Sequence, residues 1–330
     1  MQQEHPFASY IRILGKGKRG SRSLSEEEAE QAMGMILDGE VEACQLGAFL
    51  MLLRVKEETP AEIAGFVRAC RQRIQAPESL PEVILDWSSY AGKRRQLPWF
   101  ILSVLLLVDE GISVFMHGTE GHTPGRVYTR ACLEALGLPV ADSLQTVARQ
   151  LQEQGFSYLP LARLSPTLHE IIGLRPLLGL RSPIHTVARL LNPLGAPYQI
   201  QGIFHPGYRD THQLAAQLLA QPHLAVFKGE GGEAERNPDN ECLVKTLHQR
   251  DLQQETWPAL FSRRHNKDVT MDIQRLRRVW RGEDEDEYAI ASITATAAIA
   301  LKLLEPAVSQ EQALGKAQAL WQSRRRDRLG

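Results

Sequence analysis

The strongest constraint on the fold is a change of periodicity near residue 78. Before it, apolar residues repeat at helical spacing; after it, short apolar runs such as 83–87 (VILDW) and 112–116 (ISVFM) alternate with helical stretches. Strands that alternate with helices form a mainly parallel sheet with covered faces. We therefore predict an α/β protein with a small all-helical N-terminal domain, residues 1–78, and a larger α/β domain, residues 79–330.

The helical domain shows clear start signals. Ser25 and Glu28 form a capping-box pattern, and Thr59-Pro60 opens a helix that extends to about residue 72. Between them, residues 42–55 are nearly all apolar and are predicted to be buried. In the second domain, helices are expected at 97–110, 129–136, 143–154, 165–191, 210–220 and 285–304, and strands at 198–204 and 224–228, with Tyr158 and Leu159 as a candidate short strand.

Composition limits the function and the location. The chain has 330 residues and a formal net charge of −1, so it is not a generally basic coat for nucleic acid, and an anion site must come from local clusters. Its four cysteines lack metal-type spacing, which indicates reduced thiols. The first residues are mostly polar, and the longest apolar run, 97–108, is shorter than the about 20 residues that span a bilayer. We expect a cytoplasmic protein without a membrane partner.

Three stretches carry a family resemblance. Residues 24–69, 133–140 (LEALGLPV) and 173–197 resemble anthranilate phosphoribosyltransferases, a glycosyltransferase family 3 group, in order and spacing from about residue 24 to 235. The resemblance implies that chain returning near 165–190 completes the helical domain. It also implies a homodimer through the helical domains.

The first phosphate loop departs from that family. A GTGGD loop there holds pyrophosphate, because glycines let backbone N–H groups approach the phosphates. The matching residues here run from Ser88 to Arg95 and keep only Gly92, beside the bulky Tyr90. In exchange, the loop has gained Lys93, Arg94 and Arg95.

Two further motifs are also altered. The family's KHGN reads Met116-His117-Gly118-Thr119, so the phosphate-reaching lysine is absent. In the family, an adjacent pair of acids holds magnesium. Here Glu233 could replace the first acid, but Ala234 replaces the second. Arg175 matches the arginine that meets the anthranilate carboxylate in the family. The remnant cleft thus comprises Ser88, Gly92, His117, Gly118, Arg175 and Glu233, with no catalytic residue and no metal site assigned.

These departures are similar to a second group on the same fold, the second-type TrpD or YbiB-like proteins. In that group the loop after the first strand also has a serine-tyrosine-x-glycine-x-arginine-lysine form. The resemblance covers nearly the whole chain and implies a dimeric nucleic-acid-binding protein.

Basic clusters point the same way. A glycine-rich cluster at the start could follow a phosphate backbone, or simply be a solvated loop before a capped helix. Residues 261–282 hold seven Lys or Arg against two acids and are expected to present a broad cationic face, with Trp280 either stacking on a base or packing. A C-terminal arginine run, 324–328, is expected to fray. The candidate nucleic-acid contacts are Lys16, Lys18, Arg19, Lys93, Arg94, Arg95, Arg263, Arg264, Lys267, Arg275, Arg277, Arg278 and Arg281.

The leading hypothesis is therefore a homodimer that binds DNA or RNA without sequence preference and needs no cofactor, while enzymatic activity is left open and less expected. The alternative is a glycosyl or phosphoribosyl transferase with a changed substrate, motivated by Arg175, His117, Gly118 and Glu233; magnesium and phosphoribosyl pyrophosphate enter only in that case. A third hypothesis is a regulatory dimer that binds a small anion in the remnant cleft.

Overall fold

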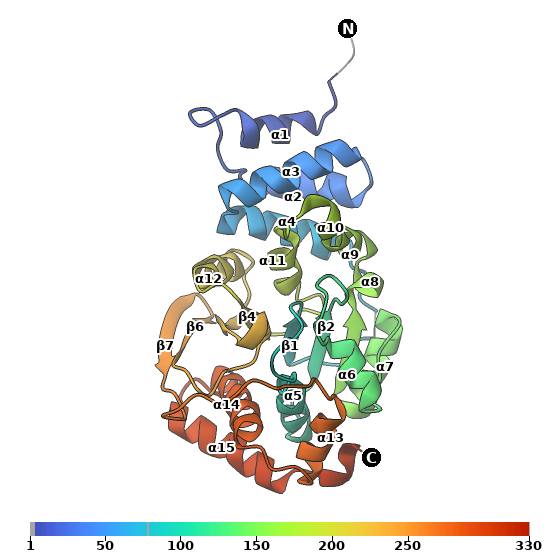
Figure 1. Ribbon diagram of the computed structural model, residues 1–330. Coiled ribbons are helices and arrows are strands. Elements are labelled where there is room, and N and C mark those ends of the chain that lie inside the picture. Colours follow the sequence, from blue (N-terminus) through green and yellow to red (C-terminus); the bar gives the residue numbers. More distant parts are fainter. Residues whose placement is uncertain (1–3, 78, 330) are drawn as a thin grey trace.

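A single seven-stranded sheet organises the protein, and a helical bundle lies above it while further helices lie below it (Figure 1). The computed structural model describes residues 4–77 and 79–329. The strand order is β3-β2-β1-β4-β5-β6-β7; the first five strands are parallel, and β6 and β7 are antiparallel. The predicted mainly parallel sheet is confirmed. The strands are β1 (Leu85–Ser89), β2 (Val114–Gly118), β3 (Phe156–Pro160), β4 (Tyr198–Ile203), β5 (His223–Lys228), β6 (Cys242–His248) and β7 (Asp251–Trp257).

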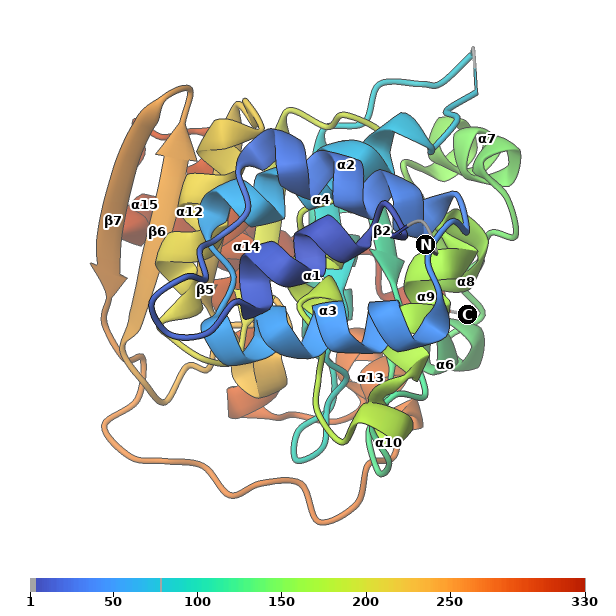
Figure 2. The same cartoon turned by 90° about the horizontal axis from the view of Figure 1, so that it is seen from above.

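The helices fall into two groups. The bundle contains α1 (Ala8–Gly15), α2 (Glu26–Leu37), α3 (Ala43–Lys56) and α4 (Pro60–Gln72), and the returning helices α8 (Leu161–Leu164), α9 (Pro166–Gly173), α10 (Arg175–Leu178) and α11 (Ile184–Arg189) lie beside it. The second group flanks the sheet and contains α5 (Phe100–Asp109), α6 (Thr129–Ala135), α7 (Leu144–Gln154), α12 (Tyr208–Leu218), α13 (Gln274–Arg281), α14 (Glu287–Leu304) and α15 (Gln310–Ser323). Seen from above, the bundle covers the centre of the sheet, and β6 and β7 extend past it (Figure 2).

The predicted capping box opens α2. The Glu28 N–H donates to Ser25 Oγ over 3.1 Å, and the Ser25 N–H donates to Glu28 Oε2 over 2.8 Å. Arg22 hydrogen-bonds the same carboxylate and, as the main cause, lowers the pKa of Glu28 to about 2. Arg22, from the basic start of the chain, therefore supports a helix end.

Alternation along the central strands sorts polar from apolar side chains. In β1, Leu85 and Trp87 join the apolar core that contains α5 and α14, whereas Asp86 and Ser88 point to the opposite face. His117 in β2 lies on that second face too, paired in register with Ser88. The face toward the helical bundle thus carries buried polar groups where the strands end.

Several local expectations are wrong. The hairpin β6–β7 and the helices α1 and α15 were not predicted. Helix α3 is only partly buried, and Val55 is 82% exposed. The C-terminal arginines do not fray: the Arg324 guanidinium lies 3.6 Å from the centre of the Trp321 ring, and Arg328 pairs with Asp109.

Two other expectations are confirmed. Trp280 packs in the core, fully buried, with its Nε1–H donating to the Arg325 carbonyl over 2.9 Å. The apolar run after residue 97 forms the buried helix α5. Among the described residues, α14 alone is long and apolar enough to cross a membrane by composition, and 72% of it is buried inside the protein, as is usual for a core helix.

The crossing of α2 and α4 gives a stability prediction. A Cβ added at Gly65 would lie 2.2 Å from the Glu26 carbonyl oxygen, so Gly65→Ala must push the two helices apart. We expect it to lower the free energy of unfolding by about 2 kcal/mol, measured by urea denaturation. Gly315→Ala is the matched control: no atom lies within 4 Å of the added Cβ in α15, and it should stabilise by up to about 1 kcal/mol. Equal effects of the two substitutions would contradict the close crossing.

Candidate functional site

The loops that follow the parallel strands meet the returning helices at the domain junction. The Arg189 guanidinium of α11 lies 6.0 Å from the ring centre of Tyr90, which follows β1. The rings of His122, after β2, and His185 in α11 are 5.0 Å apart. Ligands of open α/β sheets bind at this edge, outside the carboxyl ends of the strands.

A carboxylate of the chain itself occupies the loop after β1. The N–H groups of Ala91 and Gly92 donate to Glu233 Oε1 over 2.7 and 2.5 Å. Gly92 adopts a φ of +68°, and a Cβ there would lie 2.8 Å from the Tyr128 ring. Successive N–H groups of this kind form an anion site, and here the anion is Glu233.

A second internal carboxylate holds the start of α5. The Phe100 N–H donates to Glu235 Oε2 over 2.9 Å, and Glu235 Oε1 pairs with Lys93. Burial raises the pKa of Glu235 to about 6, with Lys93 acting in the opposite direction. Lys93 is 1% exposed, and its ammonium group is buried in the ion pair with Glu235. Its predicted contact with nucleic acid is therefore wrong.

Magnesium-bound pyrophosphate does not fit these residues. Glu233 already accepts two backbone hydrogen bonds, and the next position is the buried methyl group of Ala234. Within residues 4–77 and 79–329, no group of three or more His, Cys, Asp or Glu side chains is placed to hold a metal ion. The loop after β1 and the segment after β5 therefore offer neither the free amides nor the paired acids that such a ligand requires.

Three residues matched to the remnant cleft are structural instead. His117 is fully buried; its Nδ1 lies 2.6 Å from Tyr90 Oη, and its Nε2 lies 3.4 Å from Asp86 Oδ2. Ser88 is also buried, and a Cβ at Gly118 would lie 2.1 Å from the Ser89 carbonyl oxygen. These positions hold the strand ends together and do not line an open site.

Four arginines gather at the junction; we call Arg126, Arg175, Arg181 and Arg189 the arginine cluster. Arg126 donates to the carbonyls of Ala91 and Gly92, each over 2.9 Å, and Arg175 donates to the His122 carbonyl over 3.1 Å. No ion pair to an acid is found for any of the four among the described residues. Burial first, and then the neighbouring guanidinium groups, lower the pKa of Arg181 to about 10. Positive charge is therefore concentrated at the junction, with Glu233 as the acid that acts on Arg189.

An interdomain pocket of about 110 Å³ opens beside this cluster. It lies between the end of α3, helix α11, helix α12 and the loop after β4. Three buried atoms on its wall, Glu58 Oε2, Ser182 Oγ and His185 Nε2, have no hydrogen-bond partner in the described part of the chain. Buried polar groups are nearly always paired, so these three atoms are open to a polar ligand or to water. Its lining includes Arg54, Glu58, Arg181, Ser182, His185 and Arg189.

Sequence reasoning missed this pocket. Residues 181–189 were recognised only as part of a family-like stretch, and Glu58 was not singled out. A usable signal was the density of basic and imidazole side chains in RSPIHTVAR, within a stretch expected at the domain junction.

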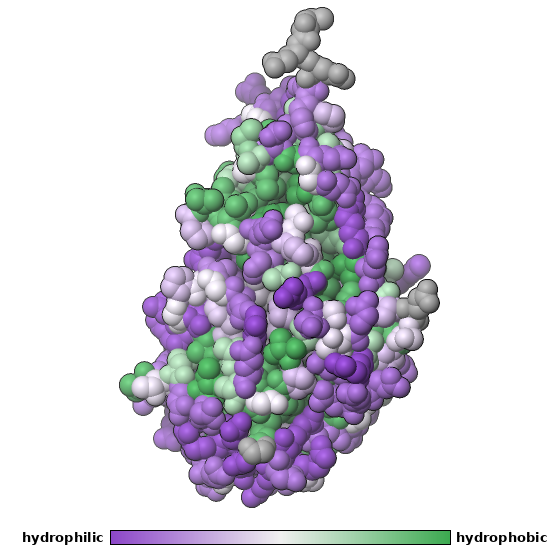
Figure 3. Space-filling view, turned by 90° about the vertical axis from the view of Figure 1, so that its right-hand side faces the viewer, coloured by the Kyte–Doolittle hydropathy of each residue, from purple (hydrophilic) through white to green (hydrophobic). Residues whose placement is uncertain are grey.

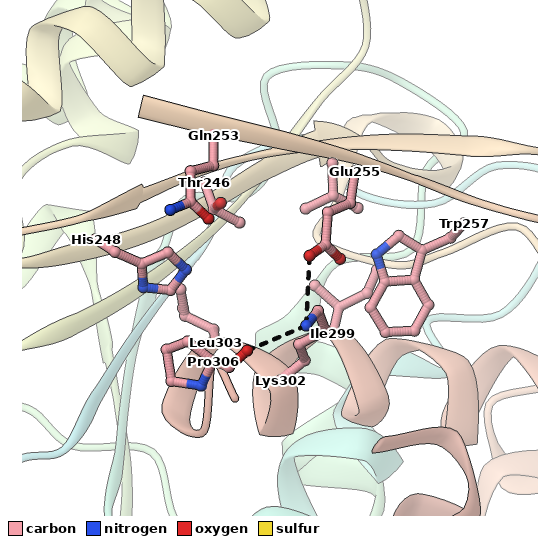
Figure 4. A pocket seen from close by; sticks show the side chains of 10 residues that line it. Thr246, His248, Gln253, Glu255, Trp257, Ile299, Lys302, Leu303 and Pro306 are labelled. Carbon is pink, nitrogen blue, oxygen red and sulfur yellow. Dashed lines mark hydrogen bonds and ion pairs between the residues drawn. The ribbon is translucent and has the colours of Figure 1, made fainter. Parts of the chain in front are cut away.

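A smaller pocket of about 30 Å³ lies between β6, β7 and α14 (Figure 4). Its one amine, Lys302 Nζ, lies 3.3 Å from Glu255 Oε1 and donates to the Pro306 and Val308 carbonyls over 3.3 and 2.7 Å. These groups satisfy one another, so this pocket is the weaker candidate.

Five of the seven basic residues of 261–282 form ion pairs, so the predicted cationic face is largely neutralised. Arg275 forms ion pairs with Asp268, Asp284 and Asp286. The other pairs are Arg263–Glu287, Lys267–Glu230, Arg278–Asp272 and Arg281–Glu283, while Arg277 donates to the Ala135 carbonyl. Lys16, Lys18, Arg19, Arg94, Arg95 and Arg264 are exposed, in separate loops. The loop of Arg94 and Arg95 lies beside residues 266–268, because the Asp268 N–H donates to the Arg95 carbonyl over 2.9 Å.

Comparison with known proteins identifies the class. Residues 8–74 match the helical bundle domain of a glycosyl transferase family, and residues 102–324 match the α/β domain of that family. The chain belongs to this glycosyl transferase family.

Individual relatives are enzymes or lack an assigned role. The chain is 31% identical to the anthranilate phosphoribosyltransferase of Anaeromyxobacter sp. (strain Fw109-5) over 63% of its own length and 62% of that protein. It is 31% identical to the uncharacterized protein YbiB of Escherichia coli (strain K12), over 61% and 64% of the two chains. The match thus spans less than two thirds of either relative. The crystal structure of anthranilate phosphoribosyltransferase from Thermus thermophilus superposes with a TM-score of 0.82 at 22% identity, covering 97% of this chain and 95% of that one, which establishes the fold.

These relatives overturn the leading hypothesis. The relatives from Anaeromyxobacter and Moorella thermoacetica are named anthranilate phosphoribosyltransferases, which indicates transfer chemistry and not nucleic-acid binding. The buried Lys93 and the ion pairs within and around residues 261–282 weaken its physical basis. The prediction that the protein binds DNA or RNA is wrong, and the transferase alternative agrees better with the family.

The internal anion gives a direct test. Glu233→Ala leaves the N–H groups of Ala91 and Gly92 buried and unpaired, so we expect the free energy of unfolding to fall by about 2 kcal/mol. The vacated site should then accept inorganic phosphate, which would raise the melting temperature of the variant more than that of the wild type. Glu241→Ala, at an exposed position, is the control. A variant that phosphate does not stabilise would show that the loop amides are not an anion site.

Proposed function

We propose that this protein is a glycosyl or phosphoribosyl transferase whose substrates are not anthranilate and magnesium-bound phosphoribosyl pyrophosphate. The observation that carries the proposal is the Glu233 carboxylate on the amides of Ala91 and Gly92, because it fills the place of a pyrophosphate on an otherwise intact family fold. Family membership supports transfer chemistry, and the filled loop argues for a different donor.

Side chains at the junction have the properties that such chemistry needs. Glycosyl transfer builds negative charge on the leaving group, and Arg181 and Arg189 offer positive charge at the junction. Glu58 is 7% exposed, and burial raises its pKa, so it holds a proton at higher pH than an exposed glutamate does. A glutamate of this kind suits general acid–base work beside a bound substrate.

A transfer assay tests the proposal. The protein is incubated with anthranilate and phosphoribosyl pyrophosphate with magnesium, and separately with sugar phosphates and nitrogen acceptors, and products are followed by mass spectrometry. We expect no phosphoribosyl anthranilate, and transfer in the second set that falls at least about tenfold in kcat/KM in Arg181→Ala. Arg264→Ala, exposed and outside the junction, is the control. Formation of phosphoribosyl anthranilate, or no transfer at all, contradicts the proposal.

We further propose a homodimer through the helical domain. Val55 on α3 is 82% exposed and Leu177 on α10 is 83% exposed, and the two helices are neighbours because an added Cβ on Gly47 would lie 4.0 Å from Leu178. Apolar residues gather over the upper, helical part of the molecule (Figure 3). Exposed apolar side chains gathered on one domain are typical of an interface.

The dimer is tested by mass in solution. The double variant Val55→Asp and Leu177→Asp should change the light-scattering mass from twice the chain mass to the 37.0 kDa of one chain, because it places two charges in the contact. Val269→Asp, 99% exposed in the α/β domain, should leave the dimer intact. A wild type that already has the mass of one chain refutes the proposal.

A further inference from the structure

Two histidines lie side by side on neighbouring antiparallel strands. His223 is the first residue of β5 and His248 is the last residue of β6, and the two are directly opposite each other in the register. The His223 N–H donates to the Pro197 carbonyl on the β4 side over 3.1 Å, so it does not bond to β6. The histidines therefore form a non-hydrogen-bonded pair, the kind in which opposite side chains lie closer. Their Nδ1 atoms are 3.3 Å apart.

The histidine pair lies on the other face of the sheet from the helical bundle. Leu224 and Leu247, the next residues along the two strands, belong to the core on the bundle side, so His223 and His248 point to the opposite face. His248 there lines the small pocket beside Lys302 of α14 (Figure 4). The start of β5 is also at the amino edge of the parallel strands, whereas the domain junction lies at their carboxyl edge. The pair is therefore remote from the candidate site at the junction.

The spacing of the two nitrogens matches the spacing that one shared metal ion requires. A transition-metal ion binds imidazole nitrogen at about 2.0–2.1 Å, so two such nitrogens at a tetrahedral angle lie about 3.3 Å apart. The Nδ1 atoms of His223 and His248 have this separation. No third His, Cys, Asp or Glu side chain joins them in a metal-binding group within residues 4–77 and 79–329, so water must supply the remaining ligands.

The surroundings of the pair hold the rings in place. The Tyr198 ring stacks on His223, with ring centres 4.5 Å apart and planes at 15°. The amide nitrogen of Gln249 lies 3.4 Å from His223 Nε2, and turning this exposed amide over lets its oxygen accept the Nε2–H instead. Such a contact to the second ring nitrogen is usual for a metal-bound histidine. The nearby cation, Lys302, is paired with Glu255 over 3.3 Å, which offsets its repulsion of a metal ion.

We infer that His223 and His248 together bind one divalent ion of the late first-row transition metals, the class of Zn²⁺, Ni²⁺ and Cu²⁺, through their Nδ1 atoms. Imidazole nitrogen selects these ions, whereas Mg²⁺ requires oxygen ligands. Each ring then carries its proton on Nε2, so one proton moves from Nδ1 to Nε2 within the pair and none is released. The ion fastens β5 to β6, where the sheet changes from parallel to antiparallel. The inference does not depend on the proposed transferase function.

Calorimetry on the full chain with Zn²⁺, and with Mg²⁺ as the control ion, tests the site. We expect one Zn²⁺ to bind per chain, no heat with Mg²⁺, and a melting temperature that rises with the Zn²⁺ concentration. His223→Gln and His248→Gln should each weaken Zn²⁺ binding by at least about tenfold. The double variant should bind no more weakly than either single variant, because both side chains hold the same ion.

His205→Gln, which removes an exposed histidine elsewhere, is the matched control and should bind Zn²⁺ like the wild type. Melting temperatures without metal show which variants fold, and either single variant is enough for the comparison. Electron paramagnetic resonance of added Cu²⁺ gives a reading on the unaltered chain and should show two nitrogen ligands. Three results overturn the inference: no heat with Zn²⁺, affinity that persists in a folded His223→Gln or His248→Gln variant, or a Cu²⁺ signal with fewer than two nitrogens.

Discussion

The hydrogen bonds from Ala91 and Gly92 to Glu233 join two loops that lie far apart in the sequence. They fix the loop after β1 to the segment after β5, and Lys93 consequently turns inward to Glu235 while Arg126 bridges the outer carbonyls. Because an internal carboxylate satisfies the amides, the loop keeps a closed shape with one glycine where a phosphate-binding loop needs several. The shape of the whole junction follows from this contact.

A buried carboxylate on the central strand β1 must also be supplied with hydrogen-bond donors. Asp86 is fully buried, and Gln199 Nε2 donates to it over 2.9 Å from the neighbouring strand β4. His117 and Tyr90 extend this network toward the strand ends. These contacts tie β1, β2 and β4 together where the strands end, which is why the residues of this network are held inside the fold.

Periodicity was enough to predict the parallel sheet and the cap at Ser25, because both depend on residues close together in the sequence. It missed β7, whose residues DLQQETW are mostly polar because that strand is largely exposed. At the site, neighbours in sequence diverge in space: Lys93 is buried, while Arg94 and Arg95 are exposed. The excess of positive charge over 261–282 was judged without Asp284 and Asp286, which lie just after that segment and form ion pairs with Arg275. Partners of that kind are set by tertiary contacts, which local patterns do not encode.

The position of β7 at the end of the sheet has a consequence for behaviour at high concentration. A terminal strand leaves a row of backbone N–H and C=O groups that another chain can extend into a continuous sheet. Here the residues from Asp251 to Gln254 are exposed, and the only apolar one, Leu252, is 42% exposed. Because the exposed part of this edge strand is polar, a strand added from another chain would bury little apolar surface. The composition of β7 therefore protects the protein against edge-to-edge aggregation without a covering helix.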